Sequence, residues 1–455
     1  MDSGLYIPQS GKALLLVNGK HFWSAVGMLN VQIIEDDKKV NMHTLIKSLE
    51  MAVTDLEEKI RLNNYAGYDP YDAKGASFFM RALAIPRKPW HANVRRKLTL
   101  APLIYGERFF PLSFRHLARI KPQVNAKGMG LIAKAYFNLY AANRDEHWYD
   151  LGQACLDWFL QNRCQDHPYP CWGYPFNWDS GVVVPAHTPT SVVTSAAFDA
   201  FWEAWVQTKR AEYLETCKKI CEFFLHGLNI TKHSNGTVSF SYTHLDHFEV
   251  HNINLMVAHC LLRAGKEINN ASYCDYGLRA ARFTMNEQNE DGSIYYWSKA
   301  QNFHNPNSID HYHSGFEIRA LFGIWQVTND AEVLKAYQKY YEFYRGRLCE
   351  RSNGCIIPKM NLKSVYPINI HSCAEAVLLA ATLCRGDNRA LNDLFKVVPW
   401  TLSKMRMKSG FYRYLIHKFG FLEIRSNIVY MRWSQAWIFL ALSEAYRAIK
   451  EIETI

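Results

Sequence analysis

Six strongly apolar segments recur along the chain at a nearly constant spacing. They begin near Asn125, Thr188, His251, His313, His371 and Arg432, at intervals of 63, 63, 62, 58 and 61 residues. Each is apolar nearly all round, as residues 255–262 and 374–381 illustrate, and a helix without a polar face is buried on every side. The spacing therefore predicts one buried helix repeated six times.

Segments with a single apolar stripe alternate with the buried ones. In residues 209–226, Tyr213, Cys217 and Phe224 share one face, and aromatic residues do the same in residues 330–346. Such a stripe predicts a surface helix that packs on one side. Equivalent surface helices are expected in the remaining intervals, at residues 145–163, 268–286 and 387–405.

A glycine turn and a short aromatic or β-branched run follow each of these surface helices. The runs occupy residues 173–178, 235–240, 291–296, 353–357 and 409–413. Glycine after Asn or Asp adopts positive φ at little cost, which predicts tight turns that lead into small strands. In residues 172–178 the rings alternate with a period of two, so Trp172, Tyr174, Phe176 and Trp178 are expected on one strand face.

The alternation of buried and half-buried helices predicts an all-α fold, an (α/α)6 toroid with short β-hairpins at one rim. A helix over residues 43–63 would supply the outer partner of the last inner helix, at 430–448, and a short helix at 73–84 would raise the count to seven pairs. Residues 1–40 are expected to form an N-terminal extension and residues 41–455 a single toroid. An open α-solenoid built from the same helix pairs is the alternative.

Composition and charge narrow the possible partners. The chain has 455 residues, a hydrophobic share of 49%, an aromatic share of 14% and a formal net charge of +10. The charge favours an anionic partner, and aromatic rings suit a cleft in which sugar faces stack. Arg95, Arg96 and Lys97 form the one local basic cluster, and no nucleic-acid-binding motif is present.

The sequence also bears on location and oligomeric contacts. The apolar stretch at residues 13–17 is too short for a signal peptide, and no window approaches the length of a membrane span. Eleven cysteines, an odd number that falls mostly on apolar helix faces, indicate reduced thiols. We therefore expect a cytoplasmic protein without a transmembrane segment, whose oligomeric state is open.

Polar residues cluster just before the predicted inner helices, so the loops of a closed ring would bring them together at one rim. Candidate catalytic residues are Tyr174, Asp179, His251, Asp310, His311, His313 and His371. Candidate substrate-binding residues are Lys127, Trp172, Asn177, Trp178, His187, Thr190, Asn252, Tyr312, Glu375 and Arg432. In particular, Trp178, His251, His313, His371 and Arg432 are expected to open onto one cavity.

Several chemistries lack the residues they need. His311 and His313 are two positions apart, as in a strand-based zinc site, but the local sequence offers no third ligand. The chain has no metal-binding His-Glu-x-x-His motif, no Gly-x-Ser-x-Gly elbow and no phosphate-binding glycine loop. We expect neither a metal nor a cofactor.

The chain resembles the six-hairpin glycosidase-like superfamily in its whole repeat, over residues 40–450. It also resembles proteins of bacterial surface-polysaccharide loci that are similar to the C-terminal domain of D-glucuronyl C5-epimerases. That likeness rests on Gly67-Tyr-Asp-Pro-Tyr-Asp72, Asn125-Ala-Lys-Gly128, Trp172-Gly-Tyr-Pro-Phe-Asn-Trp-Asp179, Thr188-Pro-Thr190 and Asp310-His-Tyr-His-Ser-Gly-Phe316. The superfamily includes hydrolases, lyases, epimerases and noncatalytic proteins, so the fold alone does not determine the activity.

Two enzyme chemistries and one binding role fit these residues. A glycosidase needs two carboxyl groups that face the scissile bond, for which Asp179, Asp310 and Glu375 are candidates, followed by Asp69, Asp72 and Asp246. Removal of the C5 proton of a uronic acid instead needs a His or Tyr base and a cation for the carboxylate. Because His, Tyr and Asn outnumber carboxylates at the rim, we favour an epimerase or lyase that acts on an anionic glycan. A glycoside hydrolase and a noncatalytic glycan-binding scaffold are the alternatives.

Overall fold

The computed structural model describes residues 14–17, 20–23, 36–86, 88–179 and 181–454. The chain divides into two compact units, residues 1–44 and 45–455. The first contains an antiparallel hairpin of β1 (Leu14–Val17) and β2 (Lys20–Trp23), and the unit boundary falls within helix α1 (Asp36–Leu62). Most of the predicted N-terminal extension, residues 1–40, lies outside the described residues.

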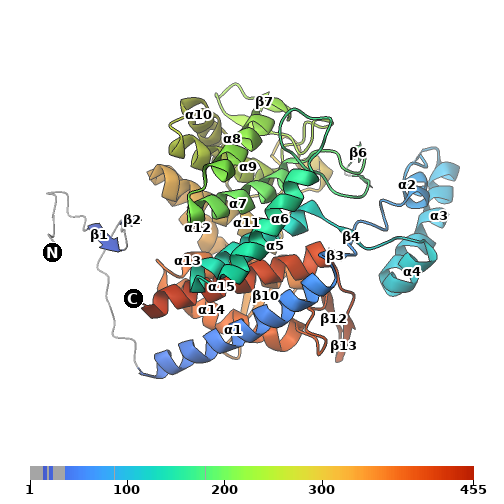
Figure 1. Ribbon diagram of the computed structural model, residues 1–455. Helices are drawn as coiled ribbons and strands as arrows, with labels where there is room; N and C mark the ends of the chain where they lie inside the picture. The colour runs from blue at the N-terminus through green and yellow to red at the C-terminus, as the bar shows by residue number, and fades with distance from the viewer. Residues whose placement is uncertain (1–13, 18–19, 24–35, 87, 180, 455) are drawn as a thin grey trace, which may run out of the picture. The chain divides into compact units, whose positions relative to one another are not determined.

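Six inner helices form a closed ring in the second unit (Figure 1). Each packs against the next, and the last packs against the first, which confirms the (α/α)6 toroid and excludes the open solenoid. The last begins with a π-helical segment, η2 (Met431–Ala436). The inner helices are α5 (Ala126–Asn143), α7 (Ser191–Thr208), α9 (His251–Glu267), α11 (His311–Thr328), α13 (Ile370–Leu383) and α15 (Trp437–Thr454).

Five outer helices lie where the apolar stripes predict them, each packed on the inner helix that precedes it. Side chains of Asp145, Asn270, Asp330 and Asp387 cap four of them by accepting a backbone N–H of the first turn. The outer helices are α6 (Glu146–Gln161), α8 (Ala211–His226), α10 (Ala271–Asn286), α12 (Ala331–Arg347) and α14 (Asn388–Met405).

Helix α1 covers the place where the ring closes. Within residues 45–62, Leu49, Ala52, Leu56 and Ile60 are fully buried. On the same helix Glu57 accepts a hydrogen bond of 3.3 Å from the Tyr136 hydroxyl of α5. The segment therefore lies against the first inner helix; its role as the outer partner of the last inner helix stays a prediction.

A belt of backbone hydrogen bonds joins the N-terminal ends of the inner helices. At five of the six, among the described residues, the N–H of the first helical residue donates to a carbonyl in the loop that leads to the next inner helix. The pairs are Ser191 to Tyr242, His251 to Tyr296, His311 to Met360, Ile370 to Tyr414 and Met431 to Tyr68, at 3.0–3.2 Å. The last bond runs from the end of the chain to its beginning, so all the helix starts lie on one rim.

Small antiparallel strand pairs follow some of the glycine turns but not all. Residues 291–296 form no strand, and in residues 172–178 only Trp178 is in one, so the predicted shared strand face of its rings is wrong. The pairs are β3 (Ala66–Gly67) with β4 (Gln123–Val124), β5 (Trp178–Asp179) with β6 (Val183–Val184), β7 (Ile230–Lys232) with β8 (Val238–Phe240), β9 (Cys349–Ser352) with β10 (Cys355–Pro358), and the three-stranded β11 (Ile368–Asn369), β12 (Leu415–Phe419) and β13 (Leu422–Ser426).

Three further helices pack together outside the inner ring: α2 (Ser77–Leu83), α3 (Trp90–Phe109) and α4 (Pro111–Leu117). Arg115 of α4 is fully buried and donates to the Asp72 carboxylate at 2.9 Å and to the carbonyl oxygen of Asp69 at 2.9 Å. They supply no seventh inner helix, so the toroid formed by the described residues has six. None of the helices in the described ranges is long and apolar enough to cross a membrane.

Close backbone contact between two inner helices predicts that a glycine there cannot be replaced without loss of stability. A Cβ at Gly130 of α5 would lie 2.7 Å from the Ala196 carbonyl oxygen of α7, whereas a Cβ at Gly346 of α12 would meet nothing within 4 Å. Gly130→Ala should lower the free energy of unfolding by about 1–3 kcal/mol. Gly346→Ala should leave it unchanged or raise it by up to about 1 kcal/mol. Urea unfolding measures both, and equal effects would contradict this packing.

Candidate active site

Aromatic and charged side chains converge where the inner helices begin. We call this set the rim group: Asp69, Tyr71, Lys127, Tyr174, Trp178, Tyr242, Tyr296, Asp310, Tyr312, His313, His371, Arg432 and Trp433. Apart from Lys127, their rings and the Arg432 cation form a continuous series of contacts of 4.5–6.2 Å. Lys127 joins this series through Trp437, which contacts both Lys127 and His371. Tyr71 is 40% exposed, so the group reaches solvent.

A buried ion pair holds one side of the rim group. Arg432 Nε and a terminal nitrogen of its guanidinium donate to the two Asp69 oxygens at 2.5 and 2.8 Å. The guanidinium also lies 5.2 Å from the ring centre of Tyr174 and 5.1 Å from that of Trp433. This ion pair joins residues that are 363 positions apart in sequence. It also fixes the Arg432 cation beside the rings of Tyr174 and Trp433.

The tyrosines of the rim group are neutral phenols. Burial raises the pKa of Tyr174 to about 12. Burial also raises the pKa values of Tyr242, Tyr296 and Tyr312 well above that of a free phenol. A phenol that stays protonated donates a hydrogen bond or a proton, so these side chains are suited to act as acids and hydroxyl donors rather than as bases.

His313 forms a dyad with Asp310 at the start of α11. Asp310 caps the helix by accepting the His313 backbone N–H at 2.9 Å, and its other oxygen lies 2.6 Å from His313 Nδ1. A carboxylate only accepts, so it holds the hydrogen on Nδ1 and leaves a lone pair on Nε2. The ring lies 4.6 Å from Tyr296 and 4.5 Å from Tyr312, centre to centre. The dyad is the arrangement of an oriented general base.

His371 is a buried imidazole, and the described residues supply no hydrogen-bond partner for either of its ring nitrogens. Tyr312, Trp433 and Trp437 surround it, with ring centres 4.5–4.8 Å away. Burial, reinforced by the positive charges of Lys127 and Arg432, lowers its pKa well below the ordinary range. His371 is therefore a neutral ring that lacks the hydrogen bonds buried polar groups normally make.

Lys127 crosses the interior of the ring. It begins on α5, and its Nζ lies 5.8 Å from the ring centre of Phe316, on the opposite inner helix, and 5.3 Å from that of Trp437. Burial, together with the charge of Arg432, lowers the pKa of Lys127 to about 7. It is a cation without a carboxylate partner in the described part of the chain, and its charge responds to pH near neutrality.

Two candidate histidines point away from the rim group, toward outer helices. His251 lies 3.1 Å from the Thr284 hydroxyl of α10 and 2.9 Å from Glu287, so the prediction that it shares a cavity with Trp178, His313, His371 and Arg432 is wrong. His311 lies 2.8 Å from the Tyr344 hydroxyl of α12, and burial lowers its pKa to about 3. Both hold outer helices in place.

Five more candidates are engaged in turns, in a helix cap or in the core. Asp179 is exposed and accepts the Gly181 N–H in the β5–β6 turn, and Thr190 caps α7. Trp172 is buried against Phe159 and donates to the Phe159 carbonyl oxygen at 3.1 Å. The remaining two are Asn177, whose side chain bonds the backbone of Gly75 and Ala186, and His187, an exposed residue with a left-handed backbone.

Two candidates lie on inner helices without joining the rim group. Glu375 is fully buried and accepts two hydrogen bonds from Arg319, at 2.6 and 3.0 Å. Asn252, in the first turn of α9, is buried, and no residue in the described ranges bonds its Oδ1. Deeper in the ring Arg447 pairs with Glu203 at 2.7 Å, so charged pairs continue along the interior.

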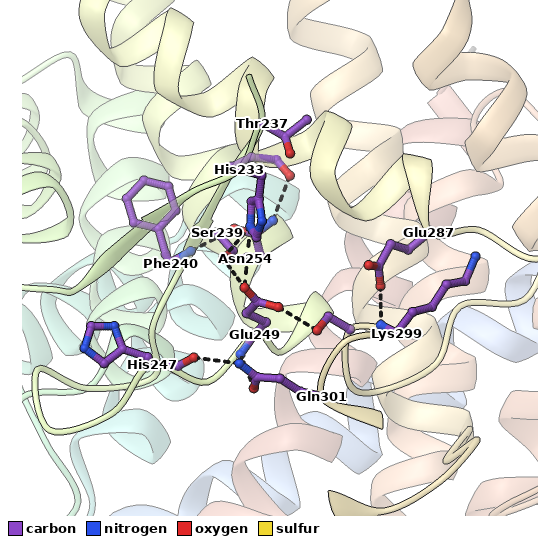
Figure 2. Close-up of polar contacts among 12 residues, drawn as sticks. His233, Thr237, Ser239, Phe240, His247, Glu249, Asn254, Glu287, Lys299 and Gln301 are labelled. Atoms are coloured by element: carbon purple, nitrogen blue, oxygen red, sulfur yellow. Dashed lines mark hydrogen bonds and ion pairs between the residues drawn. The ribbon is translucent and has the colours of Figure 1, made fainter. Parts of the chain in front are cut away.

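A second polar cluster, around Glu249, resembles a catalytic triad only in composition (Figure 2). His233 Nε2 lies 3.2 Å from the Ser239 hydroxyl and 3.5 Å from Glu249 Oε1. A triad needs the carboxylate and the nucleophile on opposite ring nitrogens, whereas here both face Nε2. Glu249 also accepts from the Ser298 hydroxyl at 2.7 Å. The cluster joins two loops and supplies no activated nucleophile.

Sequence reasoning missed four members of the rim group: Tyr71, Tyr242, Tyr296 and Trp433. A signal for two of them was present. Tyr242 and Tyr296 accept belt hydrogen bonds from the first residues of α7 and α9, and Tyr68 and Tyr414 occupy the same place in other repeats. The tyrosine therefore recurs at one position of the repeat.

Among the described residues, no three His, Cys, Asp or Glu side chains group as metal ligands.

Comparison with known proteins supports the fold. No protein-family model matches the chain, and no curated protein matches its sequence. A family 76 α-mannanase from Bacteroides thetaiotaomicron superposes with a TM-score of 0.54 at 15% identity, over 72% of this chain and 87% of the mannanase. Cellobiose 2-epimerase from Bacillus thermoamylovorans gives 0.52 at 13% identity, over 73% and 88%.

A D-mannose isomerase gives a TM-score of 0.54 at 10% identity, over 72% of this chain and 87% of the isomerase. At these identities the likeness concerns the fold and not the activity. Together with the closed ring of six inner helices, it shows that the chain has the (α/α)6 toroid fold of these enzymes.

Proposed function

We propose that this protein is a carbohydrate-active enzyme that removes the C5 proton of a uronic acid residue in an anionic glycan, as an epimerase or a lyase. The observation that carries this proposal is the His313–Asp310 dyad, at 2.6 Å, among the tyrosines of the rim group. Nε2 of His313 is the proposed base, and Asp310 positions it and stabilises the imidazolium that forms.

A sugar ligand suits the rim group for two reasons. Its aromatic faces offer stacking surfaces for pyranose rings, and its neutral tyrosine hydroxyls and Asp310 oxygens match sugar hydroxyls. Proteins with the same fold act on sugars, namely the mannanase, the cellobiose 2-epimerase and the D-mannose isomerase. The fold therefore favours a carbohydrate, and the residues of the rim group support proton abstraction.

Proton abstraction is favoured over hydrolysis because the candidate carboxylates are already engaged. Asp69 is held by Arg432, Asp72 by Arg115 and Glu375 by Arg319. Asp310 pairs with His313, Asp179 lies in an exposed turn, and Asp246 accepts hydrogen bonds from its own loop. A glycosidase needs a protonated and an ionised carboxyl on either side of one bond, and each of these candidates already has a partner or lies in an exposed turn.

Recognition of a uronate carboxylate is assigned to Lys127, supported by Arg432. Lys127 Nζ faces rings rather than a counter-ion, and the inner helices begin at the same rim, where their partial positive charge favours an anion. A bound carboxylate would stabilise the ammonium form of Lys127. The same cation would then stabilise the negative charge that builds up on the carboxylate as C5 loses its proton.

The step that follows removal of the C5 proton decides the product. In an epimerase a proton returns to C5 from the opposite face, and in a lyase the C4 oxygen leaves and takes a proton. Tyr296 and Tyr312, held protonated by burial, are the proposed donors for either route. The two outcomes share the abstraction step and its residues.

Exchange of the C5 hydrogen tests the proposed base. In D2O with uronate-containing polysaccharides, the protein should incorporate deuterium at C5 or form an unsaturated product. His313→Asn, which keeps a hydrogen-bonding group but no basic Nε2, should lower the rate by about 10²–10⁴-fold. His147→Asn, on the exposed first turn of α6, is the matched control and should be without effect. Mass spectrometry and ultraviolet absorbance measure the two products.

Other results would assign a different function. New reducing ends without an unsaturated product would indicate a glycoside hydrolase. Glycan binding without any reaction, and with the same affinity in His313→Asn, would indicate a noncatalytic binding protein. Either result contradicts proton abstraction.

The pKa of Lys127, about 7, predicts a pH-dependent affinity. The ammonium form dominates below pH 7, so uronate oligosaccharides should bind more tightly at pH 6 than at pH 8, by up to about tenfold for one charge lost. Lys127→Met should bind weakly and without this pH dependence. Isothermal titration calorimetry measures both, and an unchanged pH profile in Lys127→Met would exclude Lys127 as the carboxylate ligand.

A further inference from the structure

Helix α3 carries an apolar stripe that no other described residue covers. Nine of the twenty exposed large hydrophobic side chains in the described ranges fall within residues 90–117. On α3 they recur at helical spacing, at Trp90, Val94, Leu98, Tyr105 and Phe109, which are 78, 45, 70, 58 and 64% exposed. At 3.6 residues per turn they lie within a stripe roughly 100° wide, so they form one continuous surface, the α3 stripe.

The opposite face of α3 is the one that packs against the rest of the protein. Leu100 is buried with Phe79 and Ala82 of α2, and Leu103 and Phe114 pack against the same cluster. The α3 stripe is therefore additional apolar surface, not the side that holds the helix in the fold. Exposed apolar surface of this extent marks an interaction site in a stable protein.

Positive charge surrounds the α3 stripe. Residues 88–121 contain eight Lys and Arg residues against one acidic residue, Glu107, a surplus of seven out of the net +10 of the chain. Arg115 neutralises Glu107 from inside the fold, at 3.4 Å. The exposed cations are Lys88, Arg95, Lys97, Arg108, Arg119 and Lys121. The surface is thus both apolar and strongly cationic.

We propose that the α3 stripe docks the protein on an anionic lipid bilayer. A helix that lies in a membrane interface presents Trp, Phe and Leu to the acyl region and Lys or Arg to anionic headgroups, and α3 combines these features. Two copies of this chain would bring their surplus cations face to face, which opposes self-association through the stripe. Nucleic acid would satisfy the cations but leave the exposed Trp, Leu and Phe side chains without an apolar partner.

Vesicle co-sedimentation of the full-length chain tests the proposal. The protein should pellet with vesicles that contain phosphatidylglycerol and much less with pure phosphatidylcholine, and added salt should weaken the binding. Phe109→Glu and Leu98→Glu should each lower partitioning at least about tenfold, because a carboxylate replaces a buried apolar group and repels the headgroups. Lys97→Gln should lower it about fivefold.

Leu160→Glu is the matched control. Leu160 is 50% exposed on α6, an outer helix of the toroid, so this variant should bind as the unchanged protein does. Far-ultraviolet circular dichroism shows whether each variant stays folded; these positions are exposed, so folding should be retained. Absence of vesicle binding, equal binding to neutral vesicles, or equal loss in Leu160→Glu would overturn the proposal. Concentration-dependent dimers that Leu98→Glu abolishes would also overturn it.

Discussion

Six apolar helices in one chain can all be buried only if the first packs against the last. The backbone belt at the rim enforces this closure, because each helix start donates its N–H to the loop of the following repeat and Met431 donates to Tyr68. The helix starts of a ring closed in this way must face the same side. The convergence of residues as distant as Asp69 and Arg432 follows from that constraint, and so does the site itself.

Closure also creates a narrow interior in which every charge needs compensation. Glu375 with Arg319 and Glu203 with Arg447 satisfy one another along the ring, as buried charges must. Lys127 and His371 differ, since burial shifts both toward the neutral form and the described residues provide no carboxylate or hydrogen-bond partner. Groups left in this state are the ones that a ligand can stabilise. The paired charges stabilise the scaffold, and Lys127 and His371 are the groups proposed to contact a ligand.

Periodicity predicted the architecture well because burial on every side is a property of local sequence. The six inner helices and five outer helices lie within a few residues of their predicted bounds. The site was harder, because the direction of a side chain depends on its phase within the first turn. His311 and His313 are two positions apart, about 200° around a helix, so one faces an outer helix and the other the rim.

Other parts of the site could not be predicted from any local sequence pattern. The alternating rings of residues 172–178 suggested a strand, yet Trp172 is buried against Phe159 while Trp178 contacts Tyr242, in a segment that is mostly coil. The Asp69–Arg432 pair joins opposite ends of the toroid sequence and depends entirely on closure. Only the three-dimensional ring shows that the acidic candidates are engaged, and that no described residue bonds the second ring nitrogen of His313.

A structure of the protein with an unreactive uronate oligosaccharide bound tests the central claim most directly. The account predicts the sugar at the rim group, with C5 within about 3.5 Å of His313 Nε2, the reach of a near-attack geometry. The carboxylate of the same residue should lie against Lys127 Nζ. A sugar bound outside the rim group, or one that turns its carboxylate away from Lys127 and its C5 away from His313, would contradict it.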